Sequence, residues 1–385
     1  MDALSENAST PQRGHRSLYI NFEDDRLTGT NTKDLKGILE GYYELYPARR
    51  DEKNLYLFFD EIHEIPGWEK FIRRILDSEP YRIFITGSSA KMLSKEIASS
   101  LRGRTLVREI FPYSFVEYLR HIGENFDDKP STKERAAIVH HMNNYLLMGG
   151  FPETVAATEP LHREILQGSI ETVIYRDIVE RYGVTNIQAL RKTLVHCLQN
   201  PASSFSINKM YNTLKSQGYS IGKNSLYDFM RYFQDAYCLF SVPTFSLSSK
   251  KASLVPSKIY PIDPGLIKAY CIDRDFQRGS TLETAVFGAL RRQGNNIYYF
   301  MTAGGQEVDF FVATSNGTKA IYQVCMSLKD PSNRKRELNA LQNAMKETGL
   351  RVALVITLDE EEEISVAEGK IRSLPLWKFL RMEGS

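Results

Sequence analysis

The stretch Leu55–Trp68, LYLFFDEIHEIPGW, decides how the first third of the chain folds. Its apolar run, Leu55–Phe59, has no polar alternation, which is typical of a strand buried on both faces of a parallel sheet. Asp60 and Glu61 follow at once, so we expect them at the carboxyl end of that strand, where open α/β sheets bind ligands. Two acids there can hold a magnesium ion and polarise water for attack on a phosphate. The same letters also fit a buried strand that runs into a plain acidic turn.

The flanking sequence favours the first interpretation, because strand and helix patterns alternate on both sides. The expected strands cover residues 17–22, 55–59, 81–85 and 106–110, and the expected helices cover 35–46, 68–76 and 91–101. Such alternation predicts an α/β fold with an open sheet. Residues 1–16 are polar and aperiodic, so we expect a disordered arm there.

Composition sets broad limits on function. A length of 385 residues predicts two or three domains, and a net charge of +2 gives no general basic field for nucleic acid. The four cysteines form no C-x-x-C pair, so neither a zinc site nor a disulfide framework is indicated. Neither a signal peptide nor a membrane-spanning run is recognisable, so we expect a cytoplasmic location.

Six strings, in order, resemble a widespread prokaryotic AAA+ ATPase family with a C-terminal domain of unknown function: YINFEDDR, LFFDEIHEIPGWE, ITGSSAKML, LRGR, PYSFVEYL and GGFPE. The resemblance implies that Asp60 and Glu61 are a Walker B pair, with Asp60 supporting Mg²⁺ and Glu61 activating water. It also implies that Ser88 is the sensor-1 residue, that Arg104 is the arginine finger, and that ATP is the cofactor. His63 stands where the family often has Gln.

A phosphate-binding loop, G-x-x-x-x-G-K-[S/T], opens the family pattern but does not occur in this sequence. The string from Gly218 to Lys223 has the wrong spacing. A strand, a phosphate loop and a helix need about 25–30 residues, and residues 1–17 are too few and too polar. We therefore expect weak or absent ATP binding, either because the start is truncated or misannotated, or because a paralogue has lost its activity.

Loss of that unit has a structural corollary. In the sheet that the resemblance implies, the missing strand lies between the strands over residues 81–85 and 106–110. Removing it exposes the edges of both neighbours. We expect either that these two strands close up or that the second is poorly held.

The middle of the chain is predicted to be helical. The resemblance implies an AAA+ core over residues 17–123, a helical lid over 124–185 and a winged helix over 186–262. In the winged helix, helices are expected over 187–198, 207–215 and 223–240, with a strand over 258–262. The third of these helices carries four residues that could contact DNA: Lys223, Asn224, Tyr227 and Arg231. Asp228 and Asp235 offset its charge, so a protein-contact or spacer role stays open. Lys250 and Lys251 offer further phosphate contacts.

Residues 263–385 resemble the restriction-endonuclease-like PD-(D/E)xK fold, with the order helix, strand, Asp-bearing strand, strand, helix. Glu283 and Asp309 match the acids that bind metal in that fold. The third element reads Gln323, Val324, Cys325, which weakens metal binding and water activation. Glu307 shares a strand face with Asp309 and could substitute as a ligand. A nuclease-like fold kept as a binding scaffold is therefore favoured over a working nuclease.

Three hypotheses of function follow. The first is an AAA+ ATPase-family protein that uses ATP and Mg²⁺ weakly or not at all and acts on a DNA or protein partner. The second is a non-enzymatic DNA- or protein-binding module, and the third is a metal-dependent DNA nuclease. The predicted fold is an incomplete AAA+ P-loop-type parallel sheet with a helical lid, then a winged helix, then a PD-(D/E)xK-like α/β domain. No membrane partner is expected.

Overall fold

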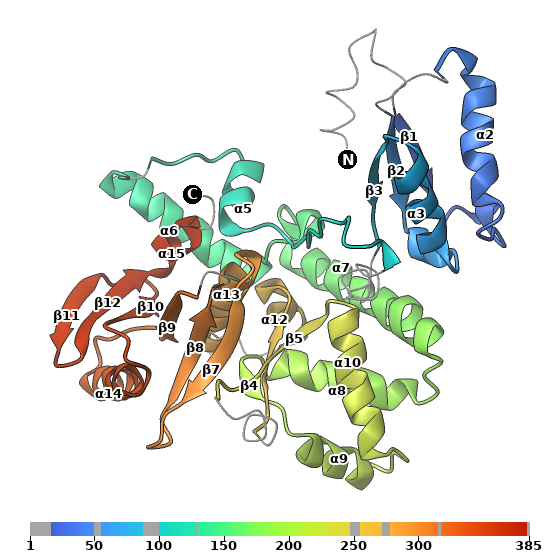
Figure 1. Ribbon diagram of the computed structural model, residues 1–385. Helices are drawn as coiled ribbons and strands as arrows, with labels where there is room; N and C mark the ends of the chain where they lie inside the picture. Colours follow the sequence, from blue (N-terminus) through green and yellow to red (C-terminus); the bar gives the residue numbers. More distant parts are fainter. Residues whose placement is uncertain are drawn as a thin grey trace. The chain divides into compact units, whose positions relative to one another are not determined.

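The computed structural model describes residues 17–49, 55–87, 100–127, 129–246, 255–271, 278–314 and 317–382. Contacts between residues divide the chain into two units, Met1–Glu109 and Ile110–Ser385, whose elements are labelled in Figure 1. The expected disordered arm, Ser88, most of the helix over 91–101, and the pair Lys250–Lys251 lie outside the described residues.

Unit 1 contains a parallel sheet. In its described part the strand order is β1-β2-β3, and all neighbours run parallel. Its elements are β1 (Ser17–Asn21), η1 (Asp25–Leu27), α2 (Leu35–Leu45), η2 (Pro47–Arg49), β2 (Tyr56–Asp60), η3 (Ile62–Glu64), α3 (Trp68–Ser78) and β3 (Arg82–Ile85). The strand predicted from the apolar run is thus confirmed as β2, at the centre of these three strands.

The core of unit 1 lies between the sheet and helices α2 and α3, which pack against the same face (Figure 1). Leu57 and Phe59 of β2 point into this core and are fully buried. Phe58 points to the other face, where it stacks on Phe84 of β3 with 5.0 Å between ring centroids, and it is also buried. Burial on both faces explains why this strand tolerates an uninterrupted apolar run.

The strand predicted over residues 106–110 is absent. Residues 104–110 are described and form no strand, and Leu106 and Ile110 are each 88% exposed. Apolar β-forming side chains are not sufficient for a strand, because its backbone groups also need a neighbouring strand. Of the two outcomes expected for this segment, the structure agrees with a segment that is poorly held.

The helical part of unit 2 ends in a small sheet. Its elements are α5 (Phe115–His121), α6 (Thr132–Met148), η5 (Pro152–Thr154), α7 (Glu159–Thr172), the π-helical η6 (Val173–Glu180), α8 (Ile187–Gln199), β4 (Ser203–Ser204), α9 (Ile207–Ser216), α10 (Lys223–Asp235), β5 (Leu239–Val242) and β6 (Lys258–Pro261). Among described residues the small sheet has the antiparallel order β4-β6-β5.

The helix predicted over 223–240 is too long, because α10 ends at Asp235. Tyr237 has a left-handed backbone with φ of 55°, which stops the helix, and Leu239 then opens β5. After β5, Thr244 forms a bridge with Tyr299, so the small sheet continues toward the larger one.

The C-terminal part of unit 2 is built on a mixed sheet. Within the described ranges, six strands have the order β11-β12-β10-β9-β8-β7, with β10 parallel to both its neighbours. The elements are α12 (Pro264–Tyr270), α13 (Arg278–Arg292), β7 (Asn296–Met301), β8 (Glu307–Ala313), β9 (Lys319–Val324), α14 (Pro331–Thr348), β10 (Val352–Thr357), β11 (Glu362–Val366), β12 (Gly369–Pro375) and α15 (Leu376–Arg381).

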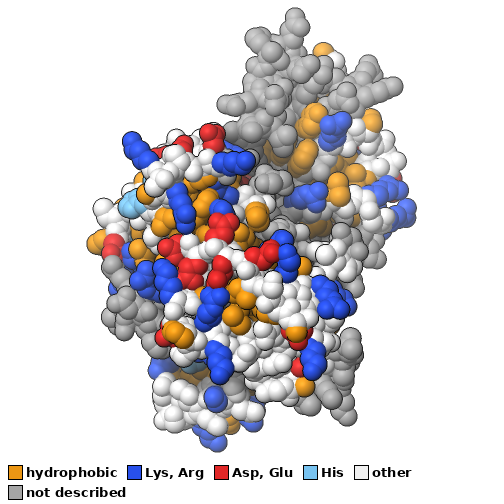
Figure 2. Space-filling model, turned by 90° about the vertical axis from the view of Figure 1, so that its left-hand side faces the viewer, with side chains coloured by type: hydrophobic (Ala, Val, Ile, Leu, Met, Phe, Trp, Pro, Cys, Tyr) orange, Lys and Arg blue, Asp and Glu red, His pale blue; other side chains and the backbone are white. Residues whose placement is uncertain are grey.

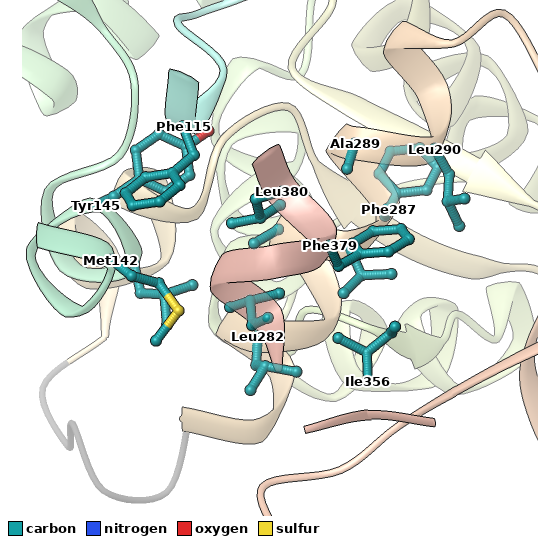
Figure 3. Close-up of a cluster of buried hydrophobic side chains, with 14 of the residues drawn as sticks. Phe115, Met142, Tyr145, Leu282, Phe287, Ala289, Leu290, Ile356, Phe379 and Leu380 are labelled. Carbon is teal, nitrogen blue, oxygen red and sulfur yellow. The ribbon is translucent and has the colours of Figure 1, made fainter. Parts of the chain in front are cut away.

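One hydrophobic core joins the start and the end of unit 2. Figure 3 shows Phe115 and Tyr145, from α5 and α6, in the same cluster as Leu282 of α13 and Phe379 of α15. A second core packs α7 and η6 against α8–α10. The helices predicted as a lid therefore share their cores with the elements that follow them.

A buried carboxylate ties α6 to α12. Asp263 is 0% exposed and accepts hydrogen bonds from the backbone N–H groups of Gly150 (2.8 Å) and Gly265 (2.7 Å). Gly149 has φ of 75°, and a Cβ added there would lie 1.7 Å from Oδ1 of Asp263. Gly149 of the GGFPE string is therefore needed because the backbone passes against this carboxylate, and Gly150 is needed because a Cβ there would lie 2.2 Å from the carbonyl oxygen of Tyr113.

The surface of unit 2 mixes charges. On the face that carries β11 and β12, acidic and basic side chains lie among one another (Figure 2), as in the pairs Glu363–Lys370 and Glu361–Lys378. None of the helices among the described residues is long and apolar enough to cross a membrane.

Candidate functional site

The carboxyl end of the unit 1 sheet brings three oxygen-bearing side chains together. Asp60 ends β2, Thr86 follows β3, and Tyr19 lies on β1. The Tyr19 hydroxyl donates to Oδ2 of Asp60 at 2.7 Å, and the Thr86 hydroxyl donates to Oδ1. This bond to Asp60 raises the pKa of the Tyr19 hydroxyl. Hydroxyl and carboxylate oxygens are the ligands that Mg²⁺ prefers, so the residues at this edge fit such an ion.

Glu61 lies beside Asp60 in an unusual conformation. Its backbone is left-handed, with φ of 52°, and its N–H donates to the Thr86 hydroxyl at 3.2 Å. A non-glycine residue there indicates local strain of the kind found at functional sites. Oε2 of Glu61 lies 3.1 Å from Nδ1 of His63, and both side chains are largely buried. The structure thus places Asp60 and Glu61 at one edge of the sheet, and the side chain of His63 lies beside that of Glu61.

Of the other two residues expected at this site, one is not described and one lies elsewhere in unit 1. Ser88 lies outside the described residues, although Thr86, two positions earlier, does reach Asp60. Arg104 pairs with Asp77 of α3, with Nη1 and Oδ1 2.6 Å apart. Asp77 stands at the end of α3 that leads into the start of β3, away from the carboxyl edge of the strands. Arg104 therefore does not contact Asp60.

A second group of charges lies in unit 2, and a lysine stands at its centre. Nζ of Lys258, on β6, lies 2.9 Å from Glu283 of α13, 2.8 Å from Glu307 and 3.0 Å from Asp309, both of β8. Lys258 is 4% exposed. The predicted nuclease-like residues are thus brought together, but around an ammonium group from a different sheet. We call Lys258, Glu283, Glu307 and Asp309 the acid cluster.

Further polar contacts complete the surroundings of the acid cluster. Oδ2 of Asp309 accepts the N–H of Val324 at 2.9 Å, and the Gln323 side chain accepts the N–H of Asp309 at 3.3 Å. The amide of Gln323 donates to Glu337 of α14 at 2.8 Å. Gln323 therefore links two buried acids by hydrogen bonds, which is an ordinary structural role for a buried amide.

Burial and charge oppose each other in this cluster. Burial would lower the pKa of Lys258, but Asp309 and its neighbours hold it above its ordinary value, so the ammonium keeps its proton. Burial and the charge of Asp309 raise the pKa of Glu283, while Lys258 and the hydroxyl of Tyr260 act in the other direction. Tyr260 donates to Oε1 of Glu283 at 2.6 Å.

The four residues proposed for DNA contact form one exposed stripe on α10. Lys223, Asn224, Tyr227 and Arg231 are all exposed, and Tyr227 is 63% exposed. The two basic side chains of this stripe already have partners within the chain. Arg231 pairs with Asp228 at 2.9 Å, and Nζ of Lys223 lies 5.5 Å from the centroid of the Tyr211 ring.

Sequence reasoning did not single out Tyr19, Thr86 and Lys258, which contact the predicted residues. Thr86 could have been found, because it directly follows the strand beside β2 in a parallel sheet. Lys258 gave a weaker signal: a lone lysine that opens an otherwise apolar strand, KIYP. Its partners lie 25 to 51 residues away in sequence, so no local pattern reports them.

Comparison with known proteins places these observations in a family. Residues 3–119 match the model of an AAA domain, and residues 139–275 and 278–379 match two domains of unknown function, DUF8612 and DUF4143. The uncharacterized protein MJ1544 of Methanocaldococcus jannaschii is 38% identical over 375 residues, which are 94% of this chain and 81% of that protein. The chain belongs to this AAA-like ATPase family with a C-terminal DUF4143 domain.

Other similarities are weaker. An uncharacterized protein of Haemophilus influenzae is 26% identical, over 91% of this chain and 84% of its own length. The solved structure of the Walker-type ATPase PABY2304 of Pyrococcus abyssi aligns with 70% of this chain and 78% of that one, at 15% identity and a TM-score of 0.35. A similarity of that size supports no further argument, and the two relatives have no described activity to compare.

Proposed function

We propose that this member of the AAA-like family uses Asp60 and Glu61 as the magnesium-binding and water-orienting acids of a nucleotide site. The observation that supports the proposal is the convergence of Asp60, Thr86 and Glu61 at the carboxyl edge of parallel strands. Asp60 would hold the ion, and the Thr86 hydroxyl fixes the direction of its carboxylate. Glu61 would orient water, with His63 controlling its side chain.

The same proposal includes weak binding of the nucleotide. The 385 residues contain no G-x-x-x-x-G-K-[S/T] string, whose amides and lysine bind the phosphates in P-loop enzymes. Carboxylates alone hold the ion and not the triphosphate. We therefore expect this polypeptide to bind ATP weakly and to hydrolyse it slowly, if at all.

Thermal unfolding with and without 1 mM Mg-ATP tests this. A site with Kd of about 10 μM would stabilise the fold by about 2.7 kcal/mol at that concentration, whereas one with Kd of about 10 mM would contribute less than about 0.1 kcal/mol. We expect the second result. A large shift that Asp60→Asn abolishes, and that Glu40→Gln on the exposed face of α2 leaves intact, would refute the weak-binding part.

The DNA upstream of the Met1 codon provides a separate test of the acids. If it encodes an in-frame phosphate loop, the longer chain should hydrolyse ATP, and Glu61→Gln should lower kcat by 100-fold or more, in the range for loss of a positioned base (about 10²–10⁴). Hydrolysis that is insensitive to both Asp60→Asn and Glu61→Gln would refute the assignment of the site.

A non-enzymatic DNA-binding role is the second candidate, supported by the exposed stripe on α10. Three helices, α8–α10, and the small antiparallel sheet have the element order of a winged helix, and α10 would be its recognition helix. Titration of a labelled duplex at several salt concentrations tests this role. A protein-contact module remains the alternative for the same stripe, and it predicts no salt-dependent binding to the duplex.

Metal-dependent cleavage of DNA is the third hypothesis, and it is disfavoured because Gln323 and Cys325 stand where the nuclease motif has an acid and a lysine. We expect no nicking of plasmid DNA by the wild-type chain in Mg²⁺ or Mn²⁺. Nicking that Asp309→Ala abolishes would reverse this conclusion.

A further inference from the structure

The acid cluster of unit 2 contains carboxylates that could bind a divalent cation, but an ammonium group occupies the position that the cation would need. Three carboxylates, from α13 and β8, converge on one point, and the atom at that point is Nζ of Lys258. Among the described residues, no group of three or more His, Cys, Asp or Glu side chains is arranged to hold a metal ion. An ion with 2.0–2.6 Å bonds to these oxygens would have to displace the ammonium.

The lysine is held in place from several directions. β6, which carries Lys258, pairs with β4 and β5. The hydroxyl of Tyr299, on β7, donates to the carbonyl of Pro256 at 2.8 Å, just before β6. Tyr260, two residues after Lys258, stacks on Phe287 of α13 with 4.6 Å between ring centroids. These contacts fix the backbone of β6 beside α13 and β8, and the Lys258 side chain that extends from it is only 4% exposed.

The charge balance also favours a cation at this point. Asp309 is 6% exposed, and Glu283 is largely buried. Buried carboxylates that lose their counter-charge are strongly destabilising. The ammonium group of Lys258 offsets this negative charge between α13 and β8, and the chain supplies it from its own β6.

We propose that Lys258 takes the place of a divalent cation and that the ion pairs of the acid cluster connect the small sheet to the large sheet of unit 2. The cluster is a structural connection and not a metal centre. This proposal is independent of the nucleotide site in unit 1.

The test is metal rescue. Lys258→Met keeps the length of the aliphatic chain and removes the charge, so three carboxylates are left facing one another. We expect the melting temperature to fall by roughly 10 °C. Addition of 1 mM MnCl₂ should restore at least half of that loss in Lys258→Met and shift the wild-type protein by less than about 1 °C. The double variant Lys258→Met with Asp309→Asn should lose the rescue.

Two results would overturn the proposal. One is Mn²⁺ binding by the wild-type chain with Kd below about 100 μM that Asp309→Asn abolishes, measured by the loss of the free Mn²⁺ electron paramagnetic resonance signal. The other is a Lys258→Met protein that is as stable as wild type. If Lys258→Met does not fold without metal, refolding it with and without 5 mM MnCl₂ tests the same proposal. Recovery only with Mn²⁺ supports the proposal. Equal failure in both conditions, with Lys370→Met folding normally, overturns the cation replacement.

Discussion

Oδ2 of Asp263 accepts a hydrogen bond from the backbone N–H of Gly150 at 2.8 Å, although 113 positions separate the two residues in sequence. The carboxyl group is fully buried at the start of α12. Burial raises its pKa to about 6, and its two backbone donors hold back part of that rise. This contact makes the junction of α6 with α12 sensitive to pH and to small changes of shape.

The first prediction concerns pH. Between the ordinary pKa of 3.8 and the folded value of about 6, the folded chain keeps a proton on Asp263 that the unfolded chain has released. The retained proton therefore stabilises the folded state. This stabilisation, about 3 kcal/mol in the free energy of unfolding, is fully present below pH 4 and is lost as pH rises through 6. Urea titrations at half-unit pH steps should show that slope in wild type and a flatter one in Asp263→Asn. Identical slopes would contradict the assignment.

The second prediction concerns Gly149. Alanine there would need a left-handed backbone and would place its Cβ 1.7 Å from Oδ1 of Asp263. We expect Gly149→Ala to destabilise unit 2 by about 3 kcal/mol or more, since strain and a broken buried hydrogen bond combine. The matched control is Gly168→Ala in α7, where a Cβ meets nothing within 4 Å. That change should be neutral or stabilising by about 0.5–1 kcal/mol. Similar losses at both positions would show that the close approach is not decisive.

The third prediction compares a buried ion pair with an exposed one. Double-mutant cycles should give a coupling of about 1–3 kcal/mol between Lys258 and Glu283. The pair Lys370–Glu363, whose side chains are 52% and 42% exposed, should give less than about 1 kcal/mol. Chemical denaturation measures both cycles. Equal couplings would mean that the buried pair contributes no more than a solvated one.

The fourth prediction concerns DNA. If the α10 stripe contacts phosphates, Lys223→Ala and Arg231→Ala should each lower the slope of log K against log salt by about 1. Lys370→Ala and Arg372→Ala, exposed on β12, remove the same charge elsewhere and should leave the slope unchanged. Equal effects from both pairs would indicate a general charge effect and exclude α10 as the contact surface.

The sequence predicted elements well where a local pattern is sufficient. The apolar run before Asp60 became β2, because its burial on both faces needs no polar alternation. The predicted strand at Leu106 failed, because strand formation also depends on a neighbour that sequence does not reveal. The start of β5 was predicted as the end of the helix over 223–240, because the apolar residues around Leu239 continue the helical spacing. The left-handed backbone of Tyr237, which ends the helix before β5, leaves no such signal in the sequence.

Site prediction followed the same division. Asp60 and Glu61 were predicted because consecutive acids after a buried strand carry a local signal, and the structure agrees on their position at the carboxyl end of β2, while their roles stay a prediction. Lys258 was not found, since the carboxylates that define its role come from α13 and β8. Glu283, Glu307 and Asp309 were predicted as one group, and the structure places each of them within 3.0 Å of Nζ of Lys258, a cation that changes what the group can do.

The shared core of Figure 3 has a practical consequence for anyone who wishes to produce parts of this protein. A fragment that starts at residue 139 or 278, where the matched domains begin, would lack Phe115 and its neighbours on α5. The apolar surface of α15 that α5 covers would then face water, and such fragments should be recovered from inclusion bodies. A cut near residue 110 leaves that core whole and is the better place to begin an expression clone.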